Sequence, residues 1–341
     1  MNVDVLEGPD EACDQFVQQR DDAELGHMPA WTRMIESAFG HTGYYLVARE
    51  GGQVRGVLPL AHIRSRLFGS RMVSQAFSDY GGPVAADGDA QQTLYDRAVE
   101  LAQRHGCQSI EFRNVAALPF DLHLRTDKVA LHLALAADSQ VVWKDLRPQI
   151  RNRIRQAEKE GVTVDHGRAE MLDEFYSLWT VRMHELGTPC YSRELFAAIL
   201  ETFPQRTRIF LAHCEGRVVA AIFAYAFNGC AHTRWGGALR QYDSKSPNYL
   251  LNWAAIEYYC AAGMKAFDFG RSTAGSGQAT FKERWGAQPV ALNWQYWTRN
   301  GKEPHVATPD APRYKRKVEM WKRLPLWVTR AMGPRISCSL P

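Results

Sequence analysis

Lys282 and His184 are side chains whose types suit chemistry at a carbonyl group. The Lys282 ammonium is a compact point charge that favours a neighbouring oxyanion or diphosphate, and an imidazole with a pKa of about 6.5 can act as a base. His184 lies at the end of a predicted helix, and Thr188 and Tyr191 follow around a Gly-Thr-Pro turn from which they can contact a substrate. The alternatives are an ordinary surface position for Lys282 and a helix-capping role for His184.

Two further pairs lie on predicted strands. Asp268 and Arg271 belong to the sequence DFGR at the end of a strand, where ligands often bind, so we consider Asp268 a candidate catalytic residue and Arg271 a candidate substrate ligand. Arg234 and Trp235 precede two glycines that would break their strand and open a groove for substrate. The alternatives are a structural ion pair between Asp268 and Arg271, and ordinary strand packing for Arg234 and Trp235.

A loop before a predicted helix is a candidate binding site for an acyl donor. The segment 240–248, RQYDSKSPN, leads into a helix predicted over 249–262. The free N–H groups of a helix N-terminus can hold a phosphate, so Arg240, Ser246 and Asn248 are candidate donor-binding residues. The alternative is a loop with an ordinary helix cap.

The order of predicted elements repeats. Strands predicted at 44–49 and 53–63 flank a Gly-containing turn, and strands at 208–214 and 217–227 do the same. Each hairpin is followed by a helix, a glycine and a strand. These are 91–105, Gly106 and 109–113 in the first half, and 249–262, Gly263 and 265–269 in the second. Such a repeat predicts two copies of one α+β domain, with coincidence between two ordinary hairpins as the alternative.

A basic segment separates the two halves. The segment 144–161, KDLRPQIRNRIRQAEKEG, predicts a helix after Pro148 that ends at Gly161, with a second helix at 171–185. The spacing of its cations predicts one charged face that binds phosphates or RNA, or that is simply solvated; these are Lys144, Arg147, Arg151 and Arg155. We therefore predict domains at 1–143 and 144–300, followed by a tail at 301–341.

The composition is that of a globular protein without a membrane span. The 341 residues are 45% apolar and 23% charged, with a net charge of +4, which is too small to indicate a nucleic-acid-binding protein by itself. No apolar run approaches the roughly 18 residues of a transmembrane helix. The acidic N-terminus carries no secretory signal, and the seven cysteines contain no CxxC pair. We expect a cytoplasmic protein with reduced thiols, without a metal site or a tightly bound cofactor.

The tail has a composition of its own. Eight Lys and Arg lie between residues 313 and 335 against the single acid Glu319, with Trp321 and Trp327 among them. This composition is typical of a helix at an anionic membrane surface, and docking on the protein's own core is the alternative. Pro325 interrupts any continuous helix. The segment 313–336 is thus a candidate for a peripheral contact with the inner membrane, with docking on the core as an equal alternative.

Several motifs together resemble the FemAB family of peptidyl and aminoacyl transferases. The segment 151–161, RNRIRQAEKEG, is similar to the basic segment that opens the second half of these proteins, and 281–286, FKERWG, resembles their FK-x-x-[FW]-G motif. The segments 78–83 (SDYGGP), 186–191 (LGTPCY) and 268–273 (DFGRST) resemble the branch linked to exosortase/PEP-CTERM systems. The resemblance covers residues 27–298, most of the chain.

The resemblance implies a fold of two tandem GNAT domains, each a mixed, mostly antiparallel sheet flanked by helices. It also implies site residues. Lys282 matches the lysine that contacts substrate phosphates and stabilises charge at the reacting carbonyl, with Phe281 and Trp285 beside the substrate. Asp79 and Tyr80 would help to bind the acceptor, although turn chemistry alone explains the glycines that follow them.

The implied activity is direct transfer of an acyl or aminoacyl group to an amine. Such a transfer needs a neutral amine, a positioned donor and a stabilised oxyanion, and in the GNAT fold a splayed strand pair exposes a backbone N–H for the oxyanion. The chain contains no G-x-S-x-G and no HExxH motif, in agreement with direct transfer. The acceptor would be a small molecule or a lipid-linked precursor of peptidoglycan, the cell envelope or an exopolysaccharide.

The donor remains open between three co-substrates. Family members use aminoacyl-tRNA, but no long coiled-coil arm is evident in the second half, so acyl-CoA and an acyl-carrier thioester are alternatives. A different class of function is a degenerate, non-catalytic binding protein at the membrane.

Overall fold

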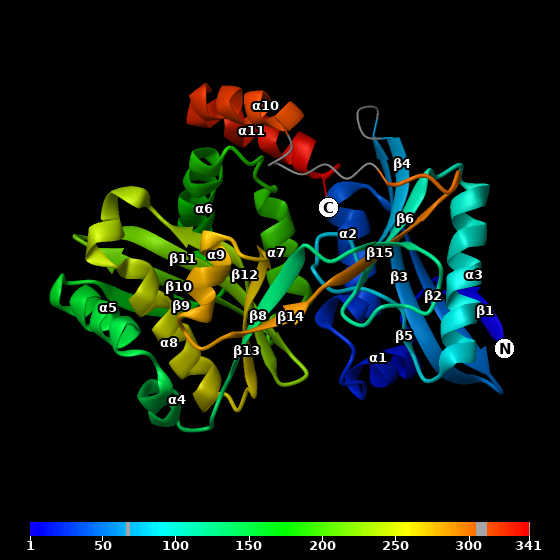
Figure 1. Cartoon of the computed structure of the whole chain (residues 1–341), viewed down its shortest axis with the longest axis horizontal. Coiled ribbons are helices and arrows are strands. Elements are labelled where there is room, and N and C mark those ends of the chain that lie inside the picture. Colours follow the sequence, from blue (N-terminus) through cyan, green and yellow to red (C-terminus); the bar gives the residue numbers. More distant parts are fainter. Residues whose placement is uncertain (66–68, 305–311, 341) are drawn as a thin grey trace. The chain divides into compact units, whose positions relative to one another are not determined.

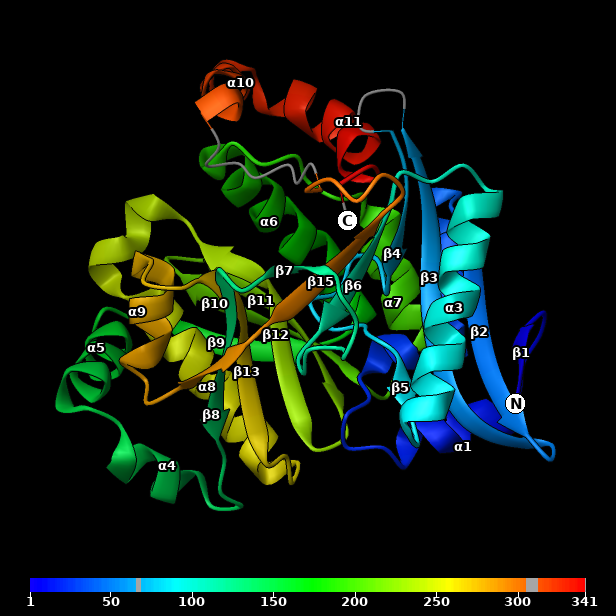
Figure 2. The same ribbon diagram turned by 45° about the vertical axis from the view of Figure 1, so that its right-hand side comes forward.

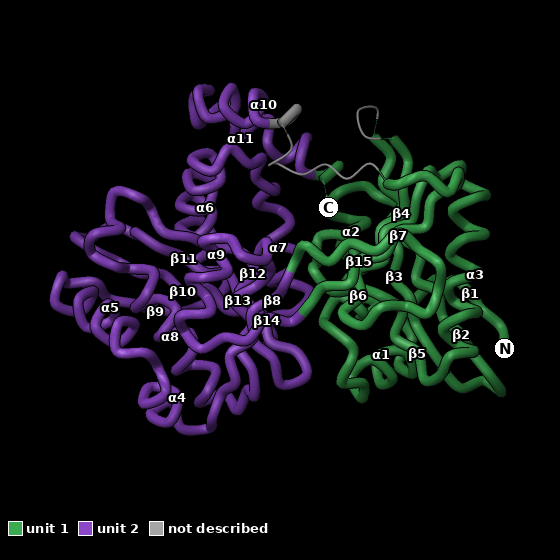
Figure 3. Tube along the Cα trace, in the orientation of Figure 1, with its two compact units in different colours: residues 1–128, 291–306, 338–341 green, residues 129–290, 307–337 purple. Residues whose placement is uncertain are grey.

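The computed structural model describes residues 1–65, 69–304 and 312–340, with side chains of the last segment described from residue 315 (Figure 1). Of the predicted tail 301–341, residues 305–311 and 341 therefore lie outside the described part. The chain forms two compact units (Figure 3). Unit 1 comprises residues 1–128, 291–306 and 338–341, and unit 2 comprises residues 129–290 and 307–337. Each contains one mixed sheet flanked by helices, which confirms the predicted α+β class.

Unit 1 is built on a sheet with the order β1-β2-β3-β4-β6-β15-β7, and β5 pairs with β3. Helix α3 packs on β2 and β3 from one face, and α1 and α2 cover the other (Figure 1). The elements are β1 (Asn2–Val5), α1 (Glu11–Gln18), η1 (Leu25–His27), α2 (Pro29–Phe39), β2 (Thr42–Glu50), β3 (Gln53–Ser65), β4 (Gly69–Ser74), β5 (Val84–Ala85), α3 (Gly88–Arg104), β6 (Ser109–Asn114), β7 (His123–Arg125) and β15 (Asn293–Thr298).

Unit 2 is built on a sheet with the order β14-β8-β13-β12-β11-β10-β9. Helices α5 and α8 pack on one face of the sheet, and α6 and α7 on the other. The elements are β8 (Lys128–Ala134), α4 (Ser139–Asp145), α5 (Pro148–Lys159), β9 (Thr163–Gly167), η2 (Ala169–Met171), α6 (Leu172–Leu186), α7 (Arg193–Thr202), β10 (Thr207–Cys214), β11 (Arg217–Phe227), β12 (Cys230–Ala238), η3 (Arg240–Lys245), α8 (Pro247–Ala261), β13 (Ala266–Thr273), α9 (Gly277–Glu283), β14 (Gln288–Ala291), α10 (Pro312–Arg323) and α11 (Leu326–Ser337).

The predicted internal repeat is confirmed by matching helix ends. Gly106 after α3 and Gly263 after α8 have φ angles of 67° and 76°, which favour glycine. In each case the next N–H closes a Schellman bond to a carbonyl five residues earlier, from Cys107 to Ala102 at 2.8 Å and from Met264 to Tyr259 at 3.0 Å. The strand that follows each glycine then pairs in parallel, β6 with β4 and β13 with β12.

The two sheets exchange one strand each. Strand β8 belongs to the first half of the sequence but lies beside β13 in the sheet of unit 2, whereas β15 lies between β6 and β7 in the sheet of unit 1 (Figure 2). The two strands occupy equivalent positions, because Arg299 after β15 donates to the carbonyl of Gln108 at 3.0 Å and Leu135 after β8 donates to that of Lys265 at 2.8 Å. Each sheet is therefore completed by a segment from the other half of the sequence.

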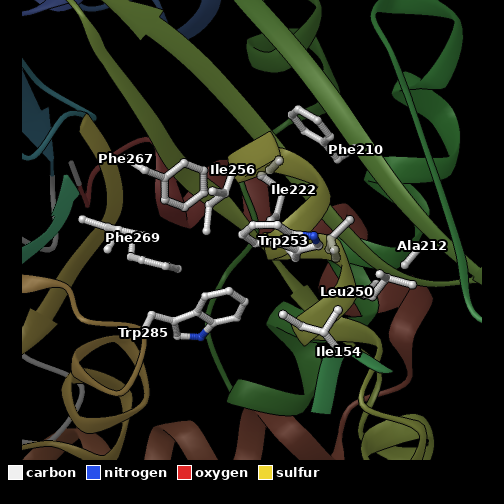
Figure 4. Close-up of a cluster of buried hydrophobic side chains, with 14 of the residues drawn as sticks. Ile154, Phe210, Ala212, Ile222, Leu250, Trp253, Ile256, Phe267, Phe269 and Trp285 are labelled. Atoms are coloured by element: carbon white, nitrogen blue, oxygen red, sulfur yellow. The ribbon is translucent and has the colours of Figure 1, made fainter. Parts of the chain in front are cut away.

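Aromatic and aliphatic side chains fill the core of unit 2. Trp285 is 1% exposed, and its ring centroid lies 5.7 Å from that of Phe269 (Figure 4). Ile154 and Ile150, from the predicted apolar stripe of α5, pack into the same cluster. Burial of side chains of this size supplies most of the favourable free energy of folding.

The predicted single basic face between the halves is wrong. Lys144 lies in α4 and Arg147 caps α5, so these two residues do not lie on the helix that carries Arg151 and Arg155. The helix predicted after Pro148 is confirmed as α5. The break between α4 and α5 follows from Pro148, which disfavours helical geometry at the preceding residue, and Arg147 has a ψ of 142°. Arg151 donates to the carbonyl of Lys144 at 2.9 Å and Arg155 stacks over the Trp143 ring. These two arginines therefore brace α4.

Candidate active site

The parallel strands β12 and β13 diverge after a short common stretch. Their register contains only three pairs and ends at His232 and Asp268, although the strands continue to Ala238 and Thr273. At the point of divergence, the Thr233 hydroxyl donates to the carbonyl of Asp268 at 2.9 Å. This is the splayed strand pair that the resemblance implies.

A β-bulge in β12 accompanies the divergence. Trp235 pairs with Phe223 of β11 and Thr233 pairs with Ala224, so Arg234 is the extra residue. Its guanidinium lies over the Trp235 ring, 5.4 Å from the centroid. Bulges re-aim side chains and often lie beside active sites. Trp235 itself is 5% exposed and packs edge-on against Phe196 and Phe223, so its ring belongs to the core.

Asp268 is a buried carboxylate placed between two imidazoles. It is 1% exposed, its Oδ2 lies 3.1 Å from Nδ1 of His232, and its Oδ1 lies 3.6 Å from Nε2 of His132. The side chain of His232 is 2% exposed, whereas that of His132, on the exchanged strand β8, is 29% exposed. The carboxylate thus lies within ion-pair distance of a partly accessible imidazole, an arrangement that suits general-base catalysis.

The predicted catalytic residues Asp268 and Lys282 meet at Gly270. The N–H of Gly270 donates to Oδ1 of Asp268 at 2.7 Å, and Nζ of Lys282 donates to the carbonyl of Gly270 at 2.8 Å and to that of Arg271 at 3.2 Å. Gly270 has a φ of 77°, and a Cβ there would lie 3.3 Å from the Thr233 carbonyl. These bonds hold β13 in its diverging path. The Lys282 ammonium therefore lies at the backbone of Gly270, two residues after the buried carboxylate of Asp268. The side chain of the next residue, Arg271, is exposed.

Lys282 is positioned by the short helix α9. The Ser276 hydroxyl caps this helix by accepting from the N–H of Ala279 at 3.2 Å. Phe281 is half-buried with its ring 5.3 Å from Tyr249, and Trp285 is fully buried. The two aromatic residues of the motif thus anchor α9 to the core of unit 2.

The predicted donor loop forms η3 and the N-terminus of α8. Ser246, which precedes the helix, has a φ of 57° and is 3% exposed, and its side chain makes no capping bond to α8. Its buried hydroxyl has no hydrogen-bond partner within the described residues. Asn248 is half-buried at the second helical position, and Arg240 is exposed. The helix therefore begins with N–H groups that no side-chain cap satisfies.

Three predicted residues lie in a different part of unit 2. His184 is in the last turn of α6 with its Nδ1 3.3 Å from the hydroxyl of Thr329 in α11. Thr188 is exposed, and its N–H donates to the carbonyl of Met183 at 2.9 Å, at the end of α6. Tyr191 stacks on Trp179 with ring centroids 6.0 Å apart. The described contacts of His184 and Tyr191 are thus with α6 and α11 rather than with the Asp268–Lys282 cluster.

Asp79 and Tyr80 are buried in unit 1. They are 5% and 4% exposed, and the carbonyl of Asp79 accepts from Nε1 of Trp294 in the exchanged strand β15 at 3.1 Å. The following Gly81 donates its N–H to the carbonyl of Arg113 at 2.7 Å. The segment is a tightly packed turn inside this unit.

His132 and His232 were not predicted from the sequence. His232 faces Asp268 across the parallel register, so the spacing of the two strands could have identified it. His132 precedes the predicted second domain, and only the strand exchange brings it beside β13. Among residues 1–65, 69–304 and 312–340, no group of three or more histidine, cysteine or acidic side chains is arranged to hold a metal ion.

Comparison with known proteins identifies the fold and the type of domain. Residues 144–283 match the acetyltransferase (GNAT) domain, so the chain is an acyltransferase with a GNAT domain. No curated protein sequence matches it.

Solved structures share the architecture of the whole chain. FemX is 14% identical with a TM-score of 0.70, covering 88% of this chain and 98% of FemX. A tandem GNAT protein from the clavulanic acid biosynthesis pathway is 16% identical with a TM-score of 0.57, covering 89% and 99%. L-PGS from Bacillus licheniformis is 16% identical with a TM-score of 0.56, covering 95% and 97%. At these identities the similarity shows the fold, which is a tandem pair of GNAT domains.

Proposed function

We propose that this chain is a FemAB-like enzyme of the exosortase/PEP-CTERM-associated branch. It transfers an acyl or aminoacyl group directly to an amine on a cell-envelope or exopolysaccharide precursor at the cytoplasmic side of the membrane. The observation that carries the proposal is the cluster of His132, Asp268, Gly270 and Lys282 at the divergence of β12 and β13. It combines a base and a cation at the position where the GNAT fold carries out acyl transfer.

The imidazole of His132 supplies the base. An ammonium acceptor must lose a proton before its nitrogen can attack, and His132 accepts this proton while the Asp268 carboxylate stabilises the resulting imidazolium. The arrangement needs no covalent intermediate on the protein. The new C–N bond forms as the bond from the carbonyl carbon to the donor's sulfur or oxygen breaks, and the leaving group takes up a proton. Positioned bases of this kind contribute about 10²–10⁴-fold to rate.

Lys282 and the diverging strands stabilise the oxyanion. Beyond His232, β12 has no further register with β13, so its backbone can face a substrate carbonyl. The Lys282 ammonium is already held at the turn by two carbonyl groups. In this proposal Lys282 adds positive charge where negative charge develops in the transition state, which is the largest single contribution in many enzymes.

The donor binds with its phosphate at the N-terminus of α8. The uncapped N–H groups and the buried Ser246 hydroxyl provide hydrogen-bond donors for an anion, and Arg240 and Asn248 lie at the same loop. Acyl-CoA, an acyl-carrier thioester and aminoacyl-tRNA all present phosphate, so each remains a donor within the proposal. GNAT domains use acyl-CoA as a co-substrate, which favours a thioester.

The decisive experiment follows the label from donor to product. The purified full chain is incubated with an extract of envelope precursors and either isotope-labelled acetyl-CoA or labelled aminoacyl-tRNA, and new amides are detected by mass spectrometry. We expect a labelled amide with one of the donors and none with the Lys282→Ala variant. If neither donor binds nor yields a labelled amide, the non-catalytic alternative replaces this proposal. A log–log salt slope of about −0.7 per phosphate contact would identify the tRNA donor.

A further inference from the structure

The helices α10 and α11 each have one face docked on unit 2. Both contact α6 (Figure 1). Arg330 donates to the hydroxyl of Thr180 at 2.9 Å, and the Ser337 hydroxyl donates to the carbonyl of Cys190 at 2.9 Å. Gly333 lies against the backbone of Cys190, where a Cβ would approach within 2.9 Å. The two helices are therefore fixed elements of the unit.

The opposite faces of these helices carry large apolar side chains. Met320 is 68% exposed, Trp327 is 73% exposed and Met332 is 45% exposed. Seven large hydrophobic side chains are exposed among the described residues, and three of them lie within these 13 positions. Such clustering differs from the scattered exposed apolar residues of an ordinary surface. Because both helices contact α6 through their inner faces, Met320 and Trp327 lie on the side away from α6.

Cations flank Met320, and the whole segment is basic. Arg316 and Arg323 are four residues before and three residues after Met320, and so share its face of α10. The described segment contains seven basic residues against the single acid Glu319, which itself pairs with Lys322 at 2.9 Å. The basic residues are Lys315, Arg316, Lys317, Lys322, Arg323, Arg330 and Arg335.

We propose that the outer face of α10 and α11 docks this protein on an anionic lipid bilayer. Trp327 and Met320 enter the boundary between headgroups and acyl chains, where a tryptophan ring is favoured, and Arg316 and Arg323 lie over the anionic headgroups. A nucleic acid would match the cations but would leave Met320 without an apolar partner. A bilayer satisfies both features. No helix in the described ranges has the length and apolarity to span a bilayer.

Vesicle flotation of the purified full chain tests this surface. We expect the protein to float with vesicles of phosphatidylcholine mixed with phosphatidylglycerol, and to bind vesicles of phosphatidylcholine alone much more weakly. The double variant Met320→Ser/Trp327→Ser should lose at least tenfold in affinity. Each of Arg316→Gln and Arg323→Gln should lose about fivefold, and added salt should weaken binding. Unchanged circular dichroism of each variant excludes unfolding as the cause.

A matched control is available in unit 1. Leu124 is 53% exposed and distant in sequence from the two helices, and Leu124→Ser should bind vesicles as the unmodified chain does. Failure of the unmodified chain to float with anionic vesicles overturns the proposal, as does equal binding by Met320→Ser/Trp327→Ser. Retention on immobilised tRNA without any vesicle binding would assign the surface to nucleic acid instead. The test needs no acyl donor, so its outcome is independent of the proposed enzymatic activity.

Discussion

Nζ of Lys282 donates a hydrogen bond to the carbonyl of Gly270 across a distance of 2.8 Å. The N–H of the same glycine is bound by the carboxylate of Asp268. One residue in a left-handed conformation therefore connects the acid and the cation that the sequence singled out. The position of the ammonium depends on the backbone of β13, so changes to Gly270 and to Lys282 should separate structural effects from catalytic ones.

Replacement of Lys282 by alanine should abolish most of the activity. Loss of the cation at the reacting carbonyl is expected to lower kcat by about 10²–10³-fold, as for removal of one oxyanion donor. Lys159, exposed at the end of α5, provides the control, and Lys159→Ala should retain full turnover. The thermal midpoint of Lys282→Ala is measured alongside. A variant that keeps normal kcat would show that Lys282 has only a structural role.

Replacement of His132 by glutamine should remove the general base. We expect kcat to fall about 10²–10⁴-fold. The chain offers a matched histidine–aspartate pair, because His213 lies 2.9 Å from Asp165 and its side chain is 28% exposed, against 29% for His132. His213→Gln should leave kcat unchanged. Equal kcat values for the two variants would remove His132 from the mechanism.

Gly270→Ala should destabilise unit 2 more than an ordinary glycine replacement does. A positive φ is unfavourable for alanine by about 1–3 kcal/mol, and here the new Cβ would also crowd the Thr233 carbonyl at 3.3 Å. Gly275 has a φ of 72°, and a Cβ added there would meet nothing within 4 Å, so Gly275→Ala isolates the backbone contribution. Urea unfolding of the two variants measures the difference. If Gly270→Ala lost less free energy of unfolding than Gly275→Ala, the result would argue against close contact between β12 and β13 where they diverge.

Unit 1 should lose stability as the pH falls below neutrality. Burial lowers the pKa of His27 below its ordinary value of 6.5. Its ring is neutral, with Nδ1 accepting from the N–H of Glu24 and Nε2 donating to the carbonyl of Gly82, each at 2.9 Å. The unfolded chain binds this proton more readily, so stability is complete above pH 6.5 and declines as the pH falls through the lowered pKa. Burial also lowers the pKa values of His41 and His62.

Hydrogen exchange measured by mass spectrometry can test this pH dependence within unit 1. After correction for the intrinsic exchange rate, protection of residues 24–27 should decrease between pH 7.5 and about pH 5.5. His27→Gln should flatten the dependence while lowering protection at neutral pH. Protection that rises on acidification would contradict the assigned neutral state of His27.

Much of the fold could be predicted from the sequence because the residues that end helices and form turns act locally. Gly106 and Gly263 end helices by adopting a conformation that other residues avoid, and the turn at Gly51 and Gly52 closes a hairpin, so the repeated order of elements was evident. The helix after Pro148 was predicted correctly, but its basic face was extended back to Lys144, through the residue before the proline. The restriction that a proline places on the preceding residue is also local and was available in the sequence.

The candidate site was only partly predictable, because it depends on pairing between distant segments. Asp268 and Lys282 lie in neighbouring motifs and were found together. His132 is more than 130 residues away from Asp268, and nothing in its own surroundings indicates that its strand joins another sheet. His184 is a candidate base from its residue type alone. Its hydrogen-bond partner Thr329 lies in the distant tail, and no local pattern indicates that pairing.

The position of β15 also determines when the sheet of unit 1 can be completed during synthesis. This strand lies between β6 and β7, yet it leaves the ribosome only after nearly 300 residues have been made. Domains commonly fold in order as the chain emerges, but here the first sheet must wait, with two strand edges open, until almost the whole polypeptide is available. A nascent chain stopped before Asn293 is consequently a target for chaperones, and a gene cut between its two halves would encode two fragments that each lack an interior strand.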